Sequence, residues 1–215
     1  MSIQLDKVQP KNKAQLKSLI DYAFNHNIYD LNFIDTSEIT NMSWLFENVE
    51  HDFDVSSWDV SNVTNMSAMF YCCWNFNCDL SNWNVSNVTN MHALFCECNK
   101  FTGKGLKHWD VSNVTNMAGM FVGCENFNCD LLYWDVSNVT DMNHMFYKCN
   151  MFTGKGLENW DVSKVADMEL MFTWCKIFNA DLSNWDISNI TRWKNMFGGC
   201  DKMTIPNWYK LYHRK

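Results

Sequence analysis

Ten cysteines give this chain its widest choice of chemistry, because thiolates form disulfides, bind metals and act as nucleophiles. Neither "CECN" nor "YCCWN" has the paired C-x-x-C spacing of a structural zinc site. Cys78 and Cys129 lie two copies of a repeat apart, about 10 Å in a regular stack, which is beyond disulfide reach. Six cysteines share one position, three residues after a phenylalanine: Cys73, Cys98, Cys124, Cys149, Cys175 and Cys200. We predict that these six are packing residues, since a free thiol packs as a small apolar group, and that Cys72 and Cys96 lie at the surface.

Aspartates also recur at one position and could bind calcium. They are Asp35, Asp59, Asp110, Asp135, Asp161 and Asp186, with Asn84 in the remaining copy. Carboxylates stacked about 5 Å apart repel one another by about 1 kcal/mol per pair in water, so they need solvent, amide donors or a cation. The glycine-rich nonapeptide of calcium-loaded repeats is absent. We predict turn-forming aspartates that accept backbone hydrogen bonds, with calcium binding as the alternative.

No combination of residues indicates catalysis or a cofactor. The histidines share no common position: they are His26, His51, His92, His108, His144 and His213. The sequence "TGKG" at Thr102 and Thr153 lacks the first glycine of a phosphate-binding loop and the Ser or Thr after Gly-Lys. We therefore interpret it as a loop insertion and predict that the protein is not an enzyme and needs no cofactor.

Tryptophan marks the repeats that must position all these residues. Copies of the phrase "WDVSNVTNM" begin at Trp58, Trp83, Trp109, Trp134, Trp160 and Trp185. Their spacing alternates between 25 and 26 residues, because "FTGKGLKHW" and "FTGKGLENW" contain one extra residue, so a 51-residue pair has been duplicated. A weaker copy begins at Asp30, with Ile34 in place of tryptophan. A large aromatic residue at a fixed position favours a packing role over a binding site.

The apolar positions within one copy match neither a helix nor a strand throughout. In the third copy they are Leu80, Trp83, Val85, Val88, Met91, Leu94, Phe95 and Cys98. This mixture predicts a short extended segment near "LSNWNV" and a helical turn near "TNMHALF", capped by Thr89. One copy cannot bury its own apolar side, but stacked copies can. The expected fold is a repeat solenoid with about seven coils of 24–26 residues, short parallel strands, and ladders of tryptophan and cysteine inside.

The two ends differ from the repeats, as an open stack requires. Residues 12–25 are predicted to form an amphipathic helix with a capping box made by Asn12 and Gln15. The last segment supplies apolar side chains for a lid: Ile205, Trp208, Tyr209, Leu211 and Tyr212. The predicted organisation is an N-terminal capping helix in residues 1–29, the repeats in residues 30–203, and a C-terminal cap in residues 204–215.

The phrase "FNCDLSNWNVSNVTNMHALF", followed by Cys98, resembles the repeat of the BspA-like leucine-rich-repeat family in its WDVSNVTNM..MF..C variant. The resemblance covers about residues 30–200. It implies a leucine-rich-repeat-like α+β solenoid, curved or twisted and right-handed, with irregular or helical returns between short strands. Members of this family are often bacterial surface proteins or lipoproteins that adhere to host proteins. The family offers no catalytic residue to transfer.

Charge and hydropathy restrict the partners and the location. A formal charge of −7 disfavours nucleic acid, and the basic end formed by Lys210, His213, Arg214 and Lys215 is expected to be a solvated tail. No segment approaches 18 continuous apolar residues, so we predict no membrane span. The first residues lack the apolar run of a signal peptide, which favours a cytoplasmic protein. Export to the cell surface by an unrecognised route is the alternative.

The residues before each tryptophan vary from copy to copy, as a recognition surface would. The central ones are Lys107, His108, Leu132, Tyr133, Glu158 and Asn159. A second candidate surface comprises Trp44, Tyr71, Trp74, Tyr147 and Trp174. The predicted function is a non-catalytic protein–protein interaction module, monomeric or weakly oligomeric, whose protein partner is unknown. The alternatives are an exported adhesin that binds host proteins and, less favoured, a calcium-binding solenoid or an enzyme.

Overall fold

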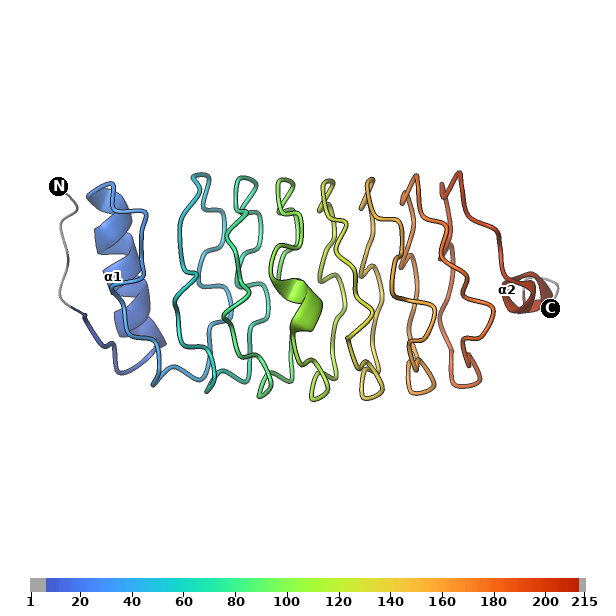
Figure 1. Ribbon diagram of the computed structural model, residues 1–215, viewed down its shortest axis with the longest axis horizontal. Helices are drawn as coiled ribbons and strands as arrows, with labels where there is room; N and C mark the ends of the chain where they lie inside the picture. The colour runs from blue at the N-terminus through green and yellow to red at the C-terminus, as the bar shows by residue number, and fades with distance from the viewer. Residues whose placement is uncertain (1–6, 213–215) are drawn as a thin grey trace.

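The chain winds into seven repeats that lie side by side in one row (Figure 1). The computed structural model describes residues 7–212. Helix α1 (Lys13–Asn25) lies at one end of the row and helix α2 (Asn207–Tyr212) at the other, and a 3-10 helix, η1 (Leu106–His108), lies between them. We number the repeats 1 to 7 by the residue that each contributes to one line of parallel bridges. These residues are Asn41, Asn65, Asn90, Asn116, Asp141, Asp167 and Arg192.

The predicted fold class, an α+β leucine-rich-repeat-like solenoid with short parallel strands, is wrong. None of residues 7–212 belongs to a strand, and the β-pairing between neighbouring repeats in this part of the chain consists of isolated parallel bridges. The helical turn expected near "TNMHALF" is also absent from the described chain, where residues 92–97 form consecutive turns. Thr89 caps no helix there, and its hydroxyl donates instead to the backbone oxygen of Thr64 in the preceding repeat, at 3.2 Å.

Left-handed residues explain why the expected strands do not form. In repeat 3, Ala93 and Glu97 have φ values of 52° and 60°, whereas parallel strands need φ near −120°. The N–H of Ala93 crosses to the oxygen of Ala118 at 2.8 Å, but the N–H of Leu94 turns back to the oxygen of Met91 at 3.2 Å. Every second amide therefore pairs with the next repeat, and those between close turns within their own repeat. The same two positions are left-handed in all seven repeats: Trp44, Ala68, Ala93, Gly119, His144, Leu170 and Asn195, and Asn48, Cys72, Glu97, Gly123, Lys148, Trp174 and Gly199.

The recurring aspartates form turns, which confirms that prediction. The N–H of Ser112 donates to Oδ1 of Asp110 at 3.1 Å, and the N–H of Ser61 donates to Oδ1 of Asp59 at 2.9 Å. The Ser112 hydroxyl also donates to Asp110 at 2.6 Å. Together the hydroxyl and the amide lower the pKa of the Asp110 carboxyl, because both stabilise its charged form. These local turns are formed by each repeat without help from its neighbours.

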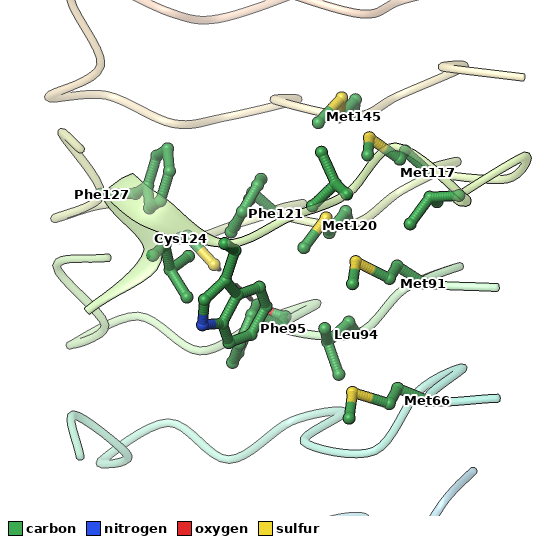
Figure 2. Packing of buried hydrophobic residues seen from close by; sticks show 14 of the residues in the cluster. Met66, Met91, Leu94, Phe95, Met117, Met120, Phe121, Cys124, Phe127 and Met145 are labelled. Atoms are coloured by element: carbon green, nitrogen blue, oxygen red, sulfur yellow. Dashed lines mark hydrogen bonds between the residues drawn. The ribbon is translucent and has the colours of Figure 1, made fainter. Parts of the chain in front are cut away.

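The interior consists of columns of identical or similar side chains, as Figure 2 shows for the methionines Met66, Met91 and Met117. Phe121 is fully buried between Phe95 and Phe146, whose ring centroids lie 5.7 and 5.6 Å away. The six predicted tryptophans are 2–5% exposed, so they belong to the core and are not a binding site. Each indole N–H donates to a backbone oxygen one repeat earlier, such as Trp109 to Leu80 at 3.2 Å. This bond gives the buried indole N–H a partner, because burying it without one would destabilise the folded state.

The six recurring cysteines are packing residues, as predicted. Cys124 is fully buried, and its thiol donates to the backbone oxygen of Phe95 at 2.9 Å. Burial raises the pKa of Cys124 well above its ordinary value, and the pKa of Cys73 to about 12. The prediction for the other pair is half wrong: Cys72 is partly exposed, but Cys96 is 8% exposed. All ten cysteines are free thiols.

Helix α1 confirms the helix predicted for residues 12–25. Asn12 accepts the N–H of Gln15 at 3.0 Å, although Gln15 accepts from Lys11 at 2.7 Å and not from Asn12 itself. Leu16, Ile20 and Ala23 are completely buried against the row.

At the other end, α2 brings the apolar ring of Trp208 onto the last repeat. The indole N–H of Trp208 donates to the backbone oxygen of Leu182 at 2.8 Å, as a tryptophan of a further repeat would. The ring of Tyr209 meets Phe197 edge-on at 4.9 Å, whereas Leu211 is 64% exposed and covers little. The side chain of Tyr212, with His213, Arg214 and Lys215, lies outside the described residues. The exact boundaries of the repeat segment, at residues 30 and 203, stay predictions.

Candidate functional site

Four of the six predicted contact residues form one exposed patch across repeats 4 and 5. The rings of His108 and Tyr133 stack with their centroids 4.9 Å apart and 30° between their planes. The ammonium group of Lys107 lies 5.4 Å from the centre of the Tyr133 ring, within the range of a cation–π contact. Leu132 and Tyr133 are 47% and 58% exposed. We call Lys107, His108, Leu132 and Tyr133 the Tyr133 patch.

The remaining two predicted residues do not join this patch. Glu158 turns back onto its own loop, where its carboxylate accepts the N–H of Gly156 at 3.0 Å. Asn159 is exposed, and it makes no hydrogen bond or ring contact with another described residue. The column position therefore brings together residues of repeats 4 and 5 but not those of repeat 6, and contact of any of them with a partner stays a prediction.

The two "TGKG" insertions position the patch. Gly105 caps η1 at its N-terminus with φ 92°, and a Cβ atom there would lie 2.3 Å from the backbone nitrogen of Ser81. Gly156 has φ 94° and approaches the nitrogen of Leu132 equally closely. Only glycine fits such a close approach at a positive φ. The inserted loops thus press against the preceding repeat and fix the backbone on which Lys107, His108 and Leu132 stand.

Charged groups border the patch on one side. Lys155 and Lys107 place their ammonium groups 3.0 and 3.5 Å from the carboxylate of Asp130, whose side chain is 16% exposed. The hydrogen bond from Lys155, with weaker help from the Leu132 amide, lowers the pKa of Asp130. Asp130 is therefore ionised at neutral pH and holds Lys107 beside the Tyr133 ring.

The second predicted surface divides into separate parts. Trp44 and Tyr71 lie 5.5 Å apart at one end, and Tyr147 pairs with His144 at 5.8 Å further along. Trp74 and Trp174 are 46% and 50% exposed.

Sequence reasoning missed a small apolar cluster beneath Tyr71. It is separate from the main core and is formed by Ala68, Ala93 and Cys96, with Tyr71 and Val122 against it. The signal that could have found it is the run of small residues in this column.

The described residues show no metal site and no membrane span. No group of three or more His, Cys, Asp or Glu side chains in residues 7–212 is placed to hold a metal ion. In the same residues, no helix has the length and apolar character needed to cross a bilayer.

Comparison with known proteins identifies the family. A family model described as "Mycoplasma protein of unknown function, DUF285" matches residues 14–128 and again residues 93–208. The two matches overlap and together cover most of the chain, as expected when the model itself contains repeats. The chain belongs to this family. No curated protein and no solved structure matches it.

Proposed function

We propose that this protein is a non-catalytic protein-binding module and that its partner docks on the Tyr133 patch. The observation that carries the proposal is a large aromatic ring, 58% exposed, held between an imidazole and an ammonium group. Tyrosines at the centre of an interface often contribute much of the binding free energy. Repeats 2, 3 and 7 have only Ser or Asn at the equivalent positions, so the patch is a local departure from a polar column.

The neighbours of Tyr133 favour binding because they restrict its ring before the partner arrives. Ordering a free side chain at an interface costs about 0.5–1.5 kcal/mol. His108 stacked on one side and Lys107 near the ring reduce that cost. Leu132, the residue before Tyr133, adds exposed apolar area. These contacts support a partner with an apolar centre and acidic groups that can reach Lys107 and Lys155.

We further propose that the repeat is related to those of BspA-like surface proteins. The recurring "WDVSNVTNM" phrase and the match to a repeat-containing family support this relation. It keeps a surface adhesin of host proteins as the alternative to a cytoplasmic module. Fractionation of the source cell decides between them, because an adhesin must be found on the surface.

The patch is tested by affinity purification from the source cell with the wild-type protein and the variant His108→Ala/Tyr133→Ala. The matched control is His144→Ala/Tyr147→Ala, which removes the same two residue types outside the Tyr133 patch. We expect a partner, identified by mass spectrometry and then purified, to bind the wild type and the control equally. Its affinity for the first variant should fall at least about tenfold. Equal binding to all three proteins rejects the patch.

Calcium binding remains the other candidate activity, through the aspartates that follow each tryptophan. In the structure their Oδ1 atoms already accept backbone N–H groups, as Asp110 does from Ser112. Calorimetric titration with calcium tests it directly. Heat of binding, together with a melting temperature that falls on chelation, would replace the proposal of a metal-free module.

A further inference from the structure

A polar groove crosses five successive repeats, away from the Tyr133 patch. Its volume is about 690 Å³, within the usual range of ligand-binding cavities. The residues that line it are Asp52, Asn75, Asn77, Lys100, Thr102, Asn126, Asn128 and Met151. Four of the eight are asparagines, and they occur as two pairs separated by the 51-residue duplication.

Asn75 and Asn126 present hydrogen-bond acceptors to this groove. The side-chain NH₂ of Asn126 donates to the backbone oxygen of Asn99 at 2.8 Å, and that of Asn75 donates to the oxygen of Glu50 at 2.5 Å. These bonds fix which end of each amide faces the neighbouring repeat, because only the nitrogen can donate to a backbone oxygen. The oxygen Oδ1 of each receives no hydrogen bond from the described residues and is left for a ligand.

Asn77 and Asn128 have the reverse arrangement and present hydrogen-bond donors to the groove. Oδ1 of Asn77 accepts both the N–H and the hydroxyl of Thr102, at 3.1 and 3.0 Å. Oδ1 of Asn128 accepts the same two groups from Thr153, at 3.1 and 2.9 Å. Their NH₂ groups donate to no described residue. The asparagines therefore form one row of fixed acceptors, with Lys100 between its two members, and one row of fixed donors, with Thr102 between its two members.

The spacing within each row selects the ligand. Backbone bonds keep the repeats at hydrogen-bonding distance here, such as Lys100 N–H to the oxygen of Trp74 at 3.1 Å and Met151 N–H to that of Glu125 at 3.2 Å. Members of a row are two repeats apart, about 9.6 Å at about 4.8 Å per repeat. A polyproline II helix has three residues per turn and rises about 3.1 Å per residue, about 9.3 Å per turn. Such a chain offers the same backbone group at nearly the same interval.

We propose that this groove binds a polypeptide segment in the polyproline II conformation. Every third N–H of the segment donates to Asn75 and Asn126, and carbonyl oxygens one turn apart accept from Asn77 and Asn128. The backbone of this helix makes no internal hydrogen bonds, so its groups are available. Met151, 50% exposed, supplies a flexible apolar contact for proline rings. Segregated donor and acceptor rows suit a peptide, whose N–H and C=O groups have fixed roles, better than a glycan, whose hydroxyls serve as either.

The probe for this site is a fluorescein-labelled peptide of repeated Pro-Pro-Ala units, which carries an N–H at every third residue. Binding is measured by fluorescence anisotropy on the full chain. The test variant is Asn77→Asp/Asn128→Asp, which keeps the acceptors for Thr102 and Thr153 but removes both outward donors. The control variant, Asn82→Asp/Asn184→Asp, adds the same charge at exposed asparagines outside the groove. Equal melting temperatures establish that all proteins are folded.

We expect the peptide to bind the wild type, the control and the Tyr133-patch variant alike, and to bind the test variant about tenfold more weakly or worse. An all-proline peptide of the same length should bind several-fold more weakly, because it lacks the N–H groups for Asn75 and Asn126. Absence of binding by the Pro-Pro-Ala peptide, or equal binding by the test variant, overturns the proposal. Binding of chitin or cellulose oligosaccharides that is lost in the test variant would assign the groove to a glycan instead.

Discussion

Repeats 4 and 7 have nearly the same sequence pattern but differ in how completely they are buried. In repeat 4, Val111 and Val114 are 1% and 0% exposed, and Cys124 is fully buried. Their counterparts Ile187 and Ile190 in repeat 7 are each 9% exposed, and Cys200 is only partly buried. The residue types differ little, so the difference comes from the neighbours. A repeat in the middle is covered on both sides, whereas the last repeat is covered on one side and by α2.

This comparison teaches that the hydrophobic core lies between repeats and not within them. Helix α2 substitutes for a following repeat at two points, the Trp208 bond to Leu182 and the Tyr209 contact with Phe197. A six-residue helix cannot cover the whole end of a repeat. Stability should therefore decrease from the middle of the row towards its C-terminal end, as expected when neighbouring units stabilise one another.

The largest effect is expected for a phenylalanine in the middle column. Phe121→Ala should lower the free energy of unfolding by about 4 kcal/mol. It leaves a cavity between Phe95 and Phe146, so both neighbouring repeats lose packing contacts. Phe197→Ala should cost about 2 kcal/mol, since Phe197 stacks on only one repeat, through Phe172. Urea unfolding followed by tryptophan fluorescence measures both. Equal losses would contradict the view that the core lies between repeats.

A smaller difference is expected for the indole hydrogen bonds. Trp109→Phe removes the indole N–H from the buried oxygen of Leu80, which keeps only the N–H of Trp83, and also buries a smaller ring, so it should cost about 2 kcal/mol. Trp208→Phe removes the matching bond to Leu182, but Trp208 is only partly buried, so water can replace the donor and the loss should stay below about 1 kcal/mol. Thermal and urea unfolding of the two variants give the comparison. A larger loss for Trp208→Phe would mean that α2 controls the stability of the whole row.

The smallest effect is expected for the aspartate turns, and here the middle and the end should nearly agree. Serine hydroxyl and amide groups lower the pKa of both Asp110 and Asp186, mainly the hydroxyl for Asp110 and the amide for Asp186. A lowered pKa stabilises the folded state above the ordinary value of 3.8, and this contribution disappears as the pH falls below it. Asp110→Asn and Asp186→Asn should each reduce the loss of stability between about pH 5 and about pH 3 by a small amount, slightly less for Asp186 because the neighbouring carboxylate of Asp161 opposes the lowering of its pKa. A clearly larger change for Asp186 would contradict this expectation.

The sequence predicted those features that depend on one residue type at one position. Tryptophans such as Trp109 recur at the same point of six copies, so their burial followed from the repeat alone. Asp110 precedes a serine by two residues, which is sufficient for a local turn. The Tyr133 patch was predictable in part, because His108 and Tyr133 occupy equivalent positions in adjacent repeats. Glu158 points away from the patch because it bonds to its own loop, and its position in the column gives no information about that bond.

The path of the backbone could not be predicted from the same pattern. Ala68 and Ala93 adopt positive φ values that alanine rarely adopts, and nothing in their type signals this. Gly119 and Gly123 of repeat 4 occupy the two left-handed positions, and with Gly199 they were local signs that the chain turns there instead of extending. The donor and acceptor rows of the groove could not be predicted from the sequence either. Asn75 and Asn77 are the same residue type and differ only in which neighbour each one contacts.

Trp208 bonds to Leu182 in the manner that each earlier indole bonds to the copy before it. The terminal helix consequently recognises a surface that any copy would offer, whatever number precedes it. Unequal recombination that deletes or adds a 51-residue unit would leave both end helices packed on a repeat and change only the length of the row of repeats. Such a gene can vary the reach of its product between generations without inventing a new fold.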